Sequence, residues 1–391
     1  MAAAEPARGG RFLRSRRSRS LAIQAGFSVL LLLLLWYVVD RASQLELDFD
    51  FLNGPAGFAI SHTWLIEFDS SDSRIAAYLV AVTNTLRLIL VGILLATVIG
   101  VLAGVARLSD NWLVSRIAAV YVEVVRNTPL LVQIVFWYTA IFLKLPRIED
   151  ERSLFGFAYL SNRSLALPWP EPRGDFFLLW VAVVAIATVP AYLVRRRRAR
   201  REAATGQTTR PNLYAVAVFL GVALVAYLAL GLPVEIGTPT IVRQEFTQSY
   251  VGGLSITPEF AAMLFALVAY TGSFIAEIVR GSIQALPRGQ GEAAMAIGLT
   301  GYQRTTLVIL PQALRSMIPS LTNEYLNLTK NSSLAAAIAY ADLFQISEII
   351  INKAGHAVVM FMVVIATYQI MSFAISGVMS YINRRVQLVG S

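Results

Sequence analysis

The most informative stretch of this sequence is GQGEAAMAIG, residues 289–298. It lies in a polar segment, 280–318, between two apolar segments that are each long enough to cross a bilayer. A connection between neighbouring helices needs only a few residues, whereas this one has about forty. Its helix-forming and helix-ending residues predict two short helices, which is the layout of a docking surface rather than of a simple tether.

The signals within this loop are specific. Residues 292–297 are good helix formers, and Gly298 suits the left-handed position just past a helix end. Thr300 and Gln303 have the spacing of a capping box that opens a second helix, and Pro311 fits the first turn of a third. A short helix with small side chains fits a groove in another protein or lies on the membrane surface. The residues alone leave both readings open.

The composition indicates an integral membrane protein. Of the 391 residues 56% are hydrophobic and only 15% are charged, and the mean hydropathy is +0.61, which is too apolar for an ordinary soluble domain. We predict an all-α fold with about eight transmembrane helices, near 21–39, 75–106, 117–143, 176–194, 212–232, 260–279, 318–340 and 357–382. The seventh segment is a polar span, and the first is expected to be an uncleaved helix rather than a signal peptide.

The distribution of the basic residues predicts how the chain is oriented in the membrane. With both termini placed in the cytoplasm, most of the 33 Lys and Arg residues fall on the cytoplasmic side, as the positive-inside rule requires. The clusters at 14–19 and 195–201 then anchor the topology beside the lipid bilayer, and no nucleic-acid partner is expected. Residues 1–20 form a basic cytoplasmic tail, and 21–143 hold the first three spans. Residues 144–257 read as an insertion with two outer loops, two spans and a solvated linker at 195–210, and 258–391 form the C-terminal part.

Several chemistries are excluded or disfavoured. The chain has no cysteine, and its two histidines, His62 and His356, are too far apart in sequence to suggest a metal site. None of the three lysines follows a glycine, so the chain has no phosphate-binding loop of the Gly-x4-Gly-Lys-Ser/Thr type. We therefore expect no cofactor in this chain and no catalytic residues. A membrane-embedded enzyme would need a nucleophile and base that we do not find.

Polar residues within the predicted spans are candidates for a transport pathway, because ionisable groups at membrane depth usually face a cavity or a partner. Glu277 and Arg280 are three residues apart and are expected to pair near the cytoplasmic end of their helix. A polar stripe on the seventh span offers acceptors and donors for a zwitterion, or hydrogen bonds to a second subunit. Its members, with two residues beside Pro129 in the third span, are Asn323, Glu324, Asn327, Lys330, Asn331, Ser332, Thr128 and Gln133.

Three groups of residues carry a family resemblance. Glu292, Ala293 and Ala294, then Gly298, then Leu310 and Pro311 resemble the EAA loop of ABC-importer permeases. The flanking runs 276–281, 286–290, 310–315, 319–323 and 328–334, and RNTPLLVQ at 126–133, are similar to the polar amino acid branch of that family. Gly291 stands where that branch usually has an aromatic residue, and Met295 where it usually has Arg. The long insertion is most similar to the long permease of general L-amino acid importers.

The resemblance implies a type I ABC-importer permease core and a function in L-amino acid import. It implies that Glu292, Ala293, Ala294, Gly298, Leu310 and Pro311 couple this chain to a separate ATPase subunit that binds ATP and Mg²⁺. The further implied partners are a second, related permease and a periplasmic amino-acid-binding protein, at the bacterial inner membrane. An ATP-independent secondary transporter or channel for small polar solutes is the alternative, although it would not need a long cytoplasmic loop with two helices.

Overall fold

The computed structural model describes residues 16–43, 48–61, 63–150, 153–154, 156–243 and 248–386. Among these described residues, six helices are long and apolar enough to cross a membrane, and a seventh span follows if one bent helix pair is counted. α1 (Arg16–Ser43) adds a shorter apolar stretch, Ile23–Tyr37. The expected eight spans are therefore roughly matched. The six are α2 (Arg74–Ala106), the helical run Leu130–Asp150, α5 (Phe177–Thr205), α6 (Pro211–Ala229), α7 (Pro258–Gln284) and α12 (Ala357–Val386).

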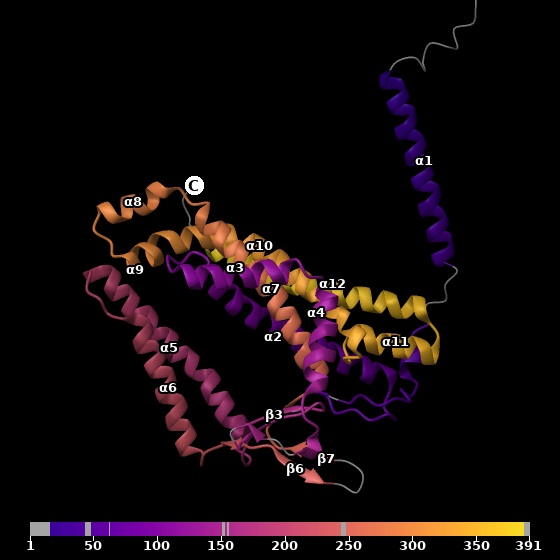
Figure 1. Cartoon of the computed structure of the whole chain (residues 1–391), viewed down its shortest axis with the longest axis horizontal. Helices are drawn as coiled ribbons and strands as arrows, with labels where there is room; N and C mark the ends of the chain where they lie inside the picture. The colour runs from indigo at the N-terminus through magenta and orange to yellow at the C-terminus, as the bar shows by residue number, and fades with distance from the viewer. Residues whose placement is uncertain are drawn as a thin grey trace, which may run out of the picture.

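The centre of the fold is the parallel pair α2 and α7, against which α10 (Leu310–Asn331) packs (Figure 1). The two helices approach closely because α2 carries glycines where α7 crosses it. A Cβ added at Gly100 would lie 2.5 Å from the Cβ of Ile275, and one at Gly104 would lie 2.7 Å from the carbonyl oxygen of Ala276. Gly100 and Gly104 are four residues apart, the small-residue spacing that lets membrane helices pack backbone to backbone.

The predicted third span, 117–143, is divided into two helices at Pro129. α3 (Trp112–Arg126) ends before Pro129, and α4 (Leu130–Phe136) begins after it and continues through η3 (Trp137–Ile141), η4 (Phe142–Lys144) and η5 (Ile148–Asp150). Proline lacks the N–H that would continue the α3 ladder. The buried Gln133 side chain donates to the freed carbonyls of Val125 at 2.9 Å and Thr128 at 3.0 Å. Those carbonyls are thus satisfied inside the fold.

The predicted seventh span, 318–340, is part of a longer bent element. α9 (Gly301–Gln303), a π-helical segment η6 (Arg304–Ile309) and α10 follow one another without a loop. The chain then tightens into the 3-10 helix η7 (Ser332–Ile338) and turns by 52° into α11 (Leu343–Ala354). The second short helix of the loop is therefore continuous with α10, and Pro311 does not begin a separate helix. The wider π turn accommodates Pro311, whose ring would clash with a carbonyl of a regular α-helical turn.

The outer loops of the insertion form small antiparallel sheets. β1 (Ser153–Leu154), β2 (Ala158–Leu160), β3 (Leu165–Leu167) and β8 (Leu254–Ile256) make one sheet in that order. β4 (Trp169–Pro172) pairs with β5 (Val234–Gly237), and β6 (Thr240–Arg243) pairs with β7 (Gln248–Val251). The pairs β3–β8 and β4–β5 join the two outer loops of the insertion to each other. The short helix η2 (Asp50–Asn53) lies in the preceding outer loop.

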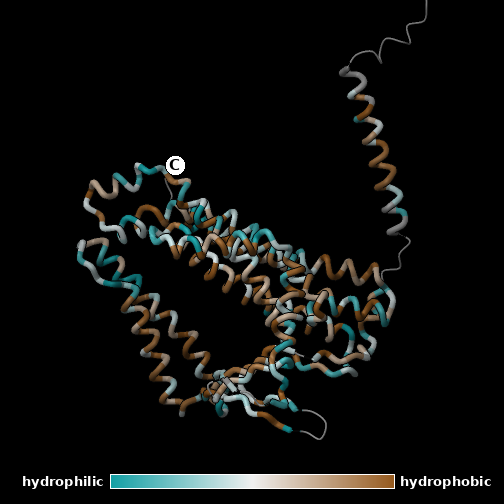
Figure 2. Tube along the Cα trace, in the orientation of Figure 1, coloured by the Kyte–Doolittle hydropathy of each residue, from teal (hydrophilic) through white to brown (hydrophobic). Residues whose placement is uncertain are grey.

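The insertion's two helices pack chiefly on each other and stand apart from the central bundle (Figure 1). None of the apolar window of α6 is buried, and both helices are hydrophobic along their middle (Figure 2). A helix that is apolar all round fits lipid rather than water. The predicted linker at 195–210 is largely helical, since α5 continues through its arginines to Thr205 and ends at Gly206 with φ +69°.

Candidate functional site

The two-helix loop begins with α8 (Arg288–Ala296), which is capped at both ends by its own sequence. Pro287 stands at its N-cap. Gly298 has φ +81°, and its N–H donates to the carbonyl of Met295 at 2.9 Å while the N–H of Leu299 donates to that of Ala294 at 3.1 Å. These two bonds form a Schellman motif, which needs a left-handed residue at the Gly298 position. The chain therefore leaves α8 in a fixed direction.

The turn between α8 and α9 is fixed by a capping box. The Thr300 side chain accepts a hydrogen bond from the Gln303 N–H, and the Gln303 side chain accepts one from the Thr300 N–H at 2.9 Å, which completes the predicted capping box. Because α9, η6 and α10 are continuous, this cap ties the end of α8 directly to the long helix α10.

The loop presents an apolar surface at its tip. Glu292 and Ala293 are exposed, whereas Ala294 is buried against the rest of the loop. Ile297, Tyr302 and Leu307 have exposed fractions of 76%, 79% and 65%. Figure 1 shows α8 and α9 beyond the ends of α7 and α10, at the end of the molecule opposite the strands. Large exposed apolar side chains that form a contiguous patch mark sites of protein or membrane interaction.

Both departures from the family's loop pattern face one arginine. The Arg304 guanidinium donates to the sulfur of Met295 at 3.2 Å, and a Cβ added at Gly291 would lie 3.9 Å from the Arg304 Cδ. The three residues line a cavity of about 900 Å³ between the loop and the end of α2. Glycine at 291 therefore leaves room beside the Arg304 side chain. Leu310, which is 40% exposed, and the half-buried Pro311 begin α10 at the far end of η6.

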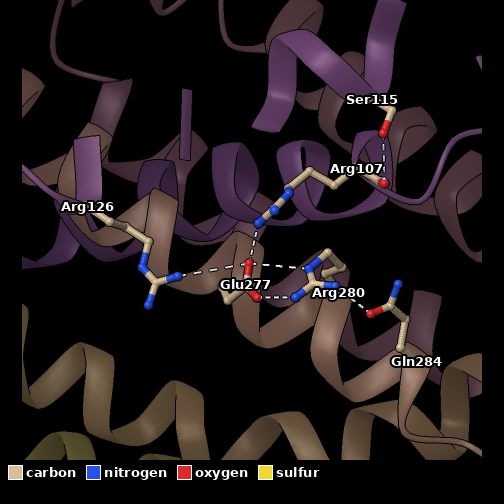
Figure 3. A network of polar contacts seen from close by, with 6 residues as sticks. All are labelled: Arg107, Ser115, Arg126, Glu277, Arg280 and Gln284. Atoms are coloured by element: carbon tan, nitrogen blue, oxygen red, sulfur yellow. Dashed lines mark hydrogen bonds and ion pairs between the residues drawn. The ribbon is translucent and has the colours of Figure 1, made fainter. Parts of the chain in front are cut away.

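A charge network lies near the C-terminal end of α7 (Figure 3). The Glu277 carboxylate on α7 forms ion pairs with Arg280 on the same helix and with Arg107 at the end of α2. Arg126, the last residue of α3, lies 4.0 Å from it and over the ring of Phe274. The sequence predicted the Glu277–Arg280 pair but missed the other two arginines, because nothing local marks partners that are about 150 to 170 residues away.

We expect Glu277→Gln to destabilise the protein, because it leaves three guanidinium groups facing one another without a counter-charge. Loss of a partner from a charged, partly buried network costs about 1–3 kcal/mol, which would lower the midpoint of thermal unfolding in detergent. Glu123→Gln is the matched control. Glu123 is exposed on the neighbouring α3 and forms no ion pair within the described residues. Equal midpoints for the two variants would contradict the structural role of the network.

The predicted polar stripe lies on one face of α10. Asn323, Asn327 and Lys330 are exposed, and Glu324 and Asn331 are half-buried. Within the described part of the chain these five side chains make no hydrogen bond or ion pair. The opposite face of α10 is buried in the central core through residues such as Met317, Leu321 and Leu328.

The other three predicted pathway residues, Ser332, Thr128 and Gln133, lie outside the polar face of α10. Ser332 is fully buried at the start of η7, and its hydroxyl donates to the Thr329 carbonyl at 2.8 Å. The Thr128 hydroxyl donates to the Val124 carbonyl at 2.9 Å. The Gln133 side chain donates hydrogen bonds to two carbonyls at the break between α3 and α4. α4, which carries Gln133, packs against η7, which begins at Ser332.

The described residues hold no group of three or more potential metal ligands. The His356 ring stacks on Phe51 with centroids 4.4 Å apart, and His62 lies outside the described residues. A chain that crosses the membrane several times and presents a rigid two-helix loop at one end has the architecture of a membrane transport subunit.

Comparison with known proteins identifies the family. The family described as "binding-protein-dependent transport system inner membrane component" matches residues 213–388. The general L-amino acid transport system permease protein AapQ of Rhizobium johnstonii is 40% identical, and the match covers 95% of this chain and 93% of that protein. The putative amino-acid ABC transporter permease protein YhdX of Escherichia coli is 39% identical, with 87% and 86% covered. This chain belongs to the family of amino-acid ABC transporter permeases.

A third relative is also a permease of an amino-acid transport system and matches over nearly its whole length. The glutamate/glutamine/aspartate/asparagine transport system permease protein BztB of Rhodobacter capsulatus is 35% identical over 95% of this chain and 94% of that protein. The three matches cover the insertion as well as the core, so the long form of the chain is shared with these relatives. The resemblance inferred from the loop and its flanking motifs is confirmed.

Proposed function

We propose that this chain is a membrane-spanning permease subunit of an ATP-driven importer of L-amino acids. The observation that carries the proposal is the rigid loop 288–309, which ends in an exposed apolar tip and continues without interruption into α10. Identity of 40% with a general L-amino acid permease supports the substrate class. The chain itself supplies no phosphate-binding loop, so a separate ATPase subunit would bind ATP and Mg²⁺.

In this proposal α8 is the element that the ATPase grips. Glu292 and Ala293 lie on its exposed side, and Gly298 fixes its exit. Nucleotide-driven closure of the ATPase would displace α8, and the capped junction at Thr300 would pass that displacement to α10. Leu310 and Pro311 begin α10, so they transmit the motion without contacting the ATPase themselves. Coupling of this kind needs a rigid connection, because a flexible loop would absorb the displacement.

The polar stripe of α10 would face a second, related permease, with the substrate path between the two subunits. A helix face that carries Asn323, Asn327 and Lys330 is costly against lipid and is stabilised against polar groups. The pair would alternate between outward-open and inward-open states, while a periplasmic binding protein delivers the amino acid. Two ATPase copies would complete the complex.

The proposed orientation puts both termini and α8 in the cytoplasm. The arginine cluster 195–201 lies at the α5–α6 turn, at the same end of the molecule as α8 and opposite the strands (Figures 1 and 2). Lysine and arginine concentrate on the cytoplasmic side of membrane proteins. The inner membrane of a bacterium is the expected location.

Purification in mild detergent tests the proposal. We expect an ATPase subunit of the ABC type to co-purify with the tagged chain, and reconstituted vesicles to take up amino acids only with ATP and a binding protein. Uptake that persists without any ATPase would favour the secondary-transporter alternative and overturn the proposal. Competition across the common amino acids in the same vesicles would define the substrate range.

A further inference from the structure

A cavity of about 630 Å³ lies at the end of the molecule that carries the strands. Its walls come from the loop before α2, the N-terminus of α7, the segment after η7 and α11, and the insertion contributes Asn162 and Arg163. We call this space the outer vestibule. Its volume is in the range of sites that hold small molecules, and it is far larger than a single amino acid requires.

Two opposite charges line the outer vestibule. Glu259, in the first turn of α7, is half-buried, and its carboxylate accepts a hydrogen bond from the Tyr138 hydroxyl at 3.0 Å. Arg163 is exposed at the β2–β3 turn. Neither residue forms an ion pair among the residues that the structure describes, so the two charges face the same space without neutralising each other.

The positions of these charges are fixed by the fold. The turn that carries Arg163 is locked by hydrogen bonds between Ser161 and Ser164, at 3.0 Å from N–H to carbonyl and 3.1 Å from N–H to hydroxyl. The Ser164 hydroxyl also bonds that of Ser255 at 2.5 Å. In the β3–β8 register Leu165 pairs with Ile256. Continuing this antiparallel register places Arg163 opposite the start of α7, where Glu259 lies.

We propose that the outer vestibule binds the zwitterionic head of an α-amino acid, with Glu259 as acceptor for the ammonium group and Arg163 as donor to the carboxylate. A guanidinium matches a carboxylate with two parallel N–H donors, and every α-amino acid has the same head. The remaining volume accommodates side chains of different size. This inference rests on the proposed import function and gives the insertion a role, because Arg163 belongs to it.

The test measures equilibrium binding of radiolabelled L-glutamine to the purified permease–ATPase complex in lipid nanodiscs, without the binding protein. We expect Glu259→Gln and Arg163→Gln each to weaken binding about tenfold. Competitors separate the two contacts. Glutamine α-amide lacks the carboxylate and glutaramate lacks the ammonium, so both should compete poorly with the wild-type complex. The Arg163→Gln variant should no longer discriminate against the amide, and the Glu259→Gln variant should no longer discriminate against glutaramate.

The matched control is Arg173→Gln. Arg173 lies in the same insertion, paired with Glu235 at 3.7 Å, but it does not line the outer vestibule, so wild-type binding is expected. Arg163→Lys should restore part of the affinity, which a loss of folding would not allow. Wild-type affinity and discrimination in both test variants would overturn the inference. If the wild-type complex itself shows no ATP-driven uptake, the proposed function fails instead, so the two failures are distinguishable.

Discussion

Gly298→Asp is expected to abolish ATP-driven amino-acid uptake while the protein still inserts into the membrane. Gly298 has φ +81° and no atom within 4 Å of the place a Cβ would take, so the new side chain meets no clash. The left-handed conformation costs a residue with a Cβ about 1–2 kcal/mol, and the Schellman motif that directs α8 needs that conformation. The carboxylate would also stand beside the exposed apolar tip. Uptake into vesicles at equal membrane abundance is the measurement.

Gly206→Asp is the matched control for this prediction. Gly206 ends α5 with φ +69°, also with open space around its Cβ position, and it lies at the same end of the molecule but outside the loop. It incurs the same backbone cost without touching α8. Near wild-type uptake is expected for this control. Equal uptake by the two variants, whether lost or retained, would contradict a specific coupling role for the α8 exit.

Gly100→Val is expected to prevent the protein from folding stably. Even the Cβ would lie 2.5 Å from the Cβ and Cγ2 of Ile275 and 2.9 Å from the carbonyl oxygen of Gly272. The backbone of α7 cannot yield as a flexible side chain could, so α2 and α7 would have to separate. Overpacking in a core costs about 1–3 kcal/mol, and separation of the central helix pair costs more. We expect loss of the monodisperse peak in detergent size-exclusion chromatography and low membrane abundance.

Gly92→Ala controls for the loss of a glycine from α2. Its Cβ would lie 3.5 Å from a terminal methyl of Leu328, which is ordinary van der Waals contact, and alanine favours the helix. Its thermal midpoint should equal or exceed that of the wild type. A Gly100→Val protein that is as stable as Gly92→Ala would show that α2 and α7 do not pack as closely as described.

Local signals in the sequence anticipated several features accurately. Thr300 and Gln303 form the capping box that their spacing indicated, and Gly298 takes the left-handed conformation expected of a glycine after a helix. Such features depend on residues within one or two turns of each other, so the sequence contains all of their partners. The apolar segments were located for the same reason, because length and hydrophobicity suffice to define a span.

Features that depend on distant partners were missed or misplaced. The sequence gives no sign that Arg107 and Arg126 join Glu277, because these partners lie about 150 to 170 residues away from it. The strands of the outer loops are absent from the sequence prediction, because they are short and pair across the α5–α6 hairpin. In each case the structure is decided by contacts between segments far apart in sequence and not by local propensity.

The sequence by itself determined that the chain is a multi-span membrane protein, where α8 ends, and that no phosphate-binding loop is present. The tertiary structure alone decided that Arg107 and Arg126 join Glu277, that Gly100 lies against α7, and that Arg163 and Glu259 line one cavity. The reason is physical. Hydrophobicity and helix caps are set by neighbours along the chain, whereas the partner of a charge or a glycine is set by helix crossing and strand register, which bring together residues far apart in sequence.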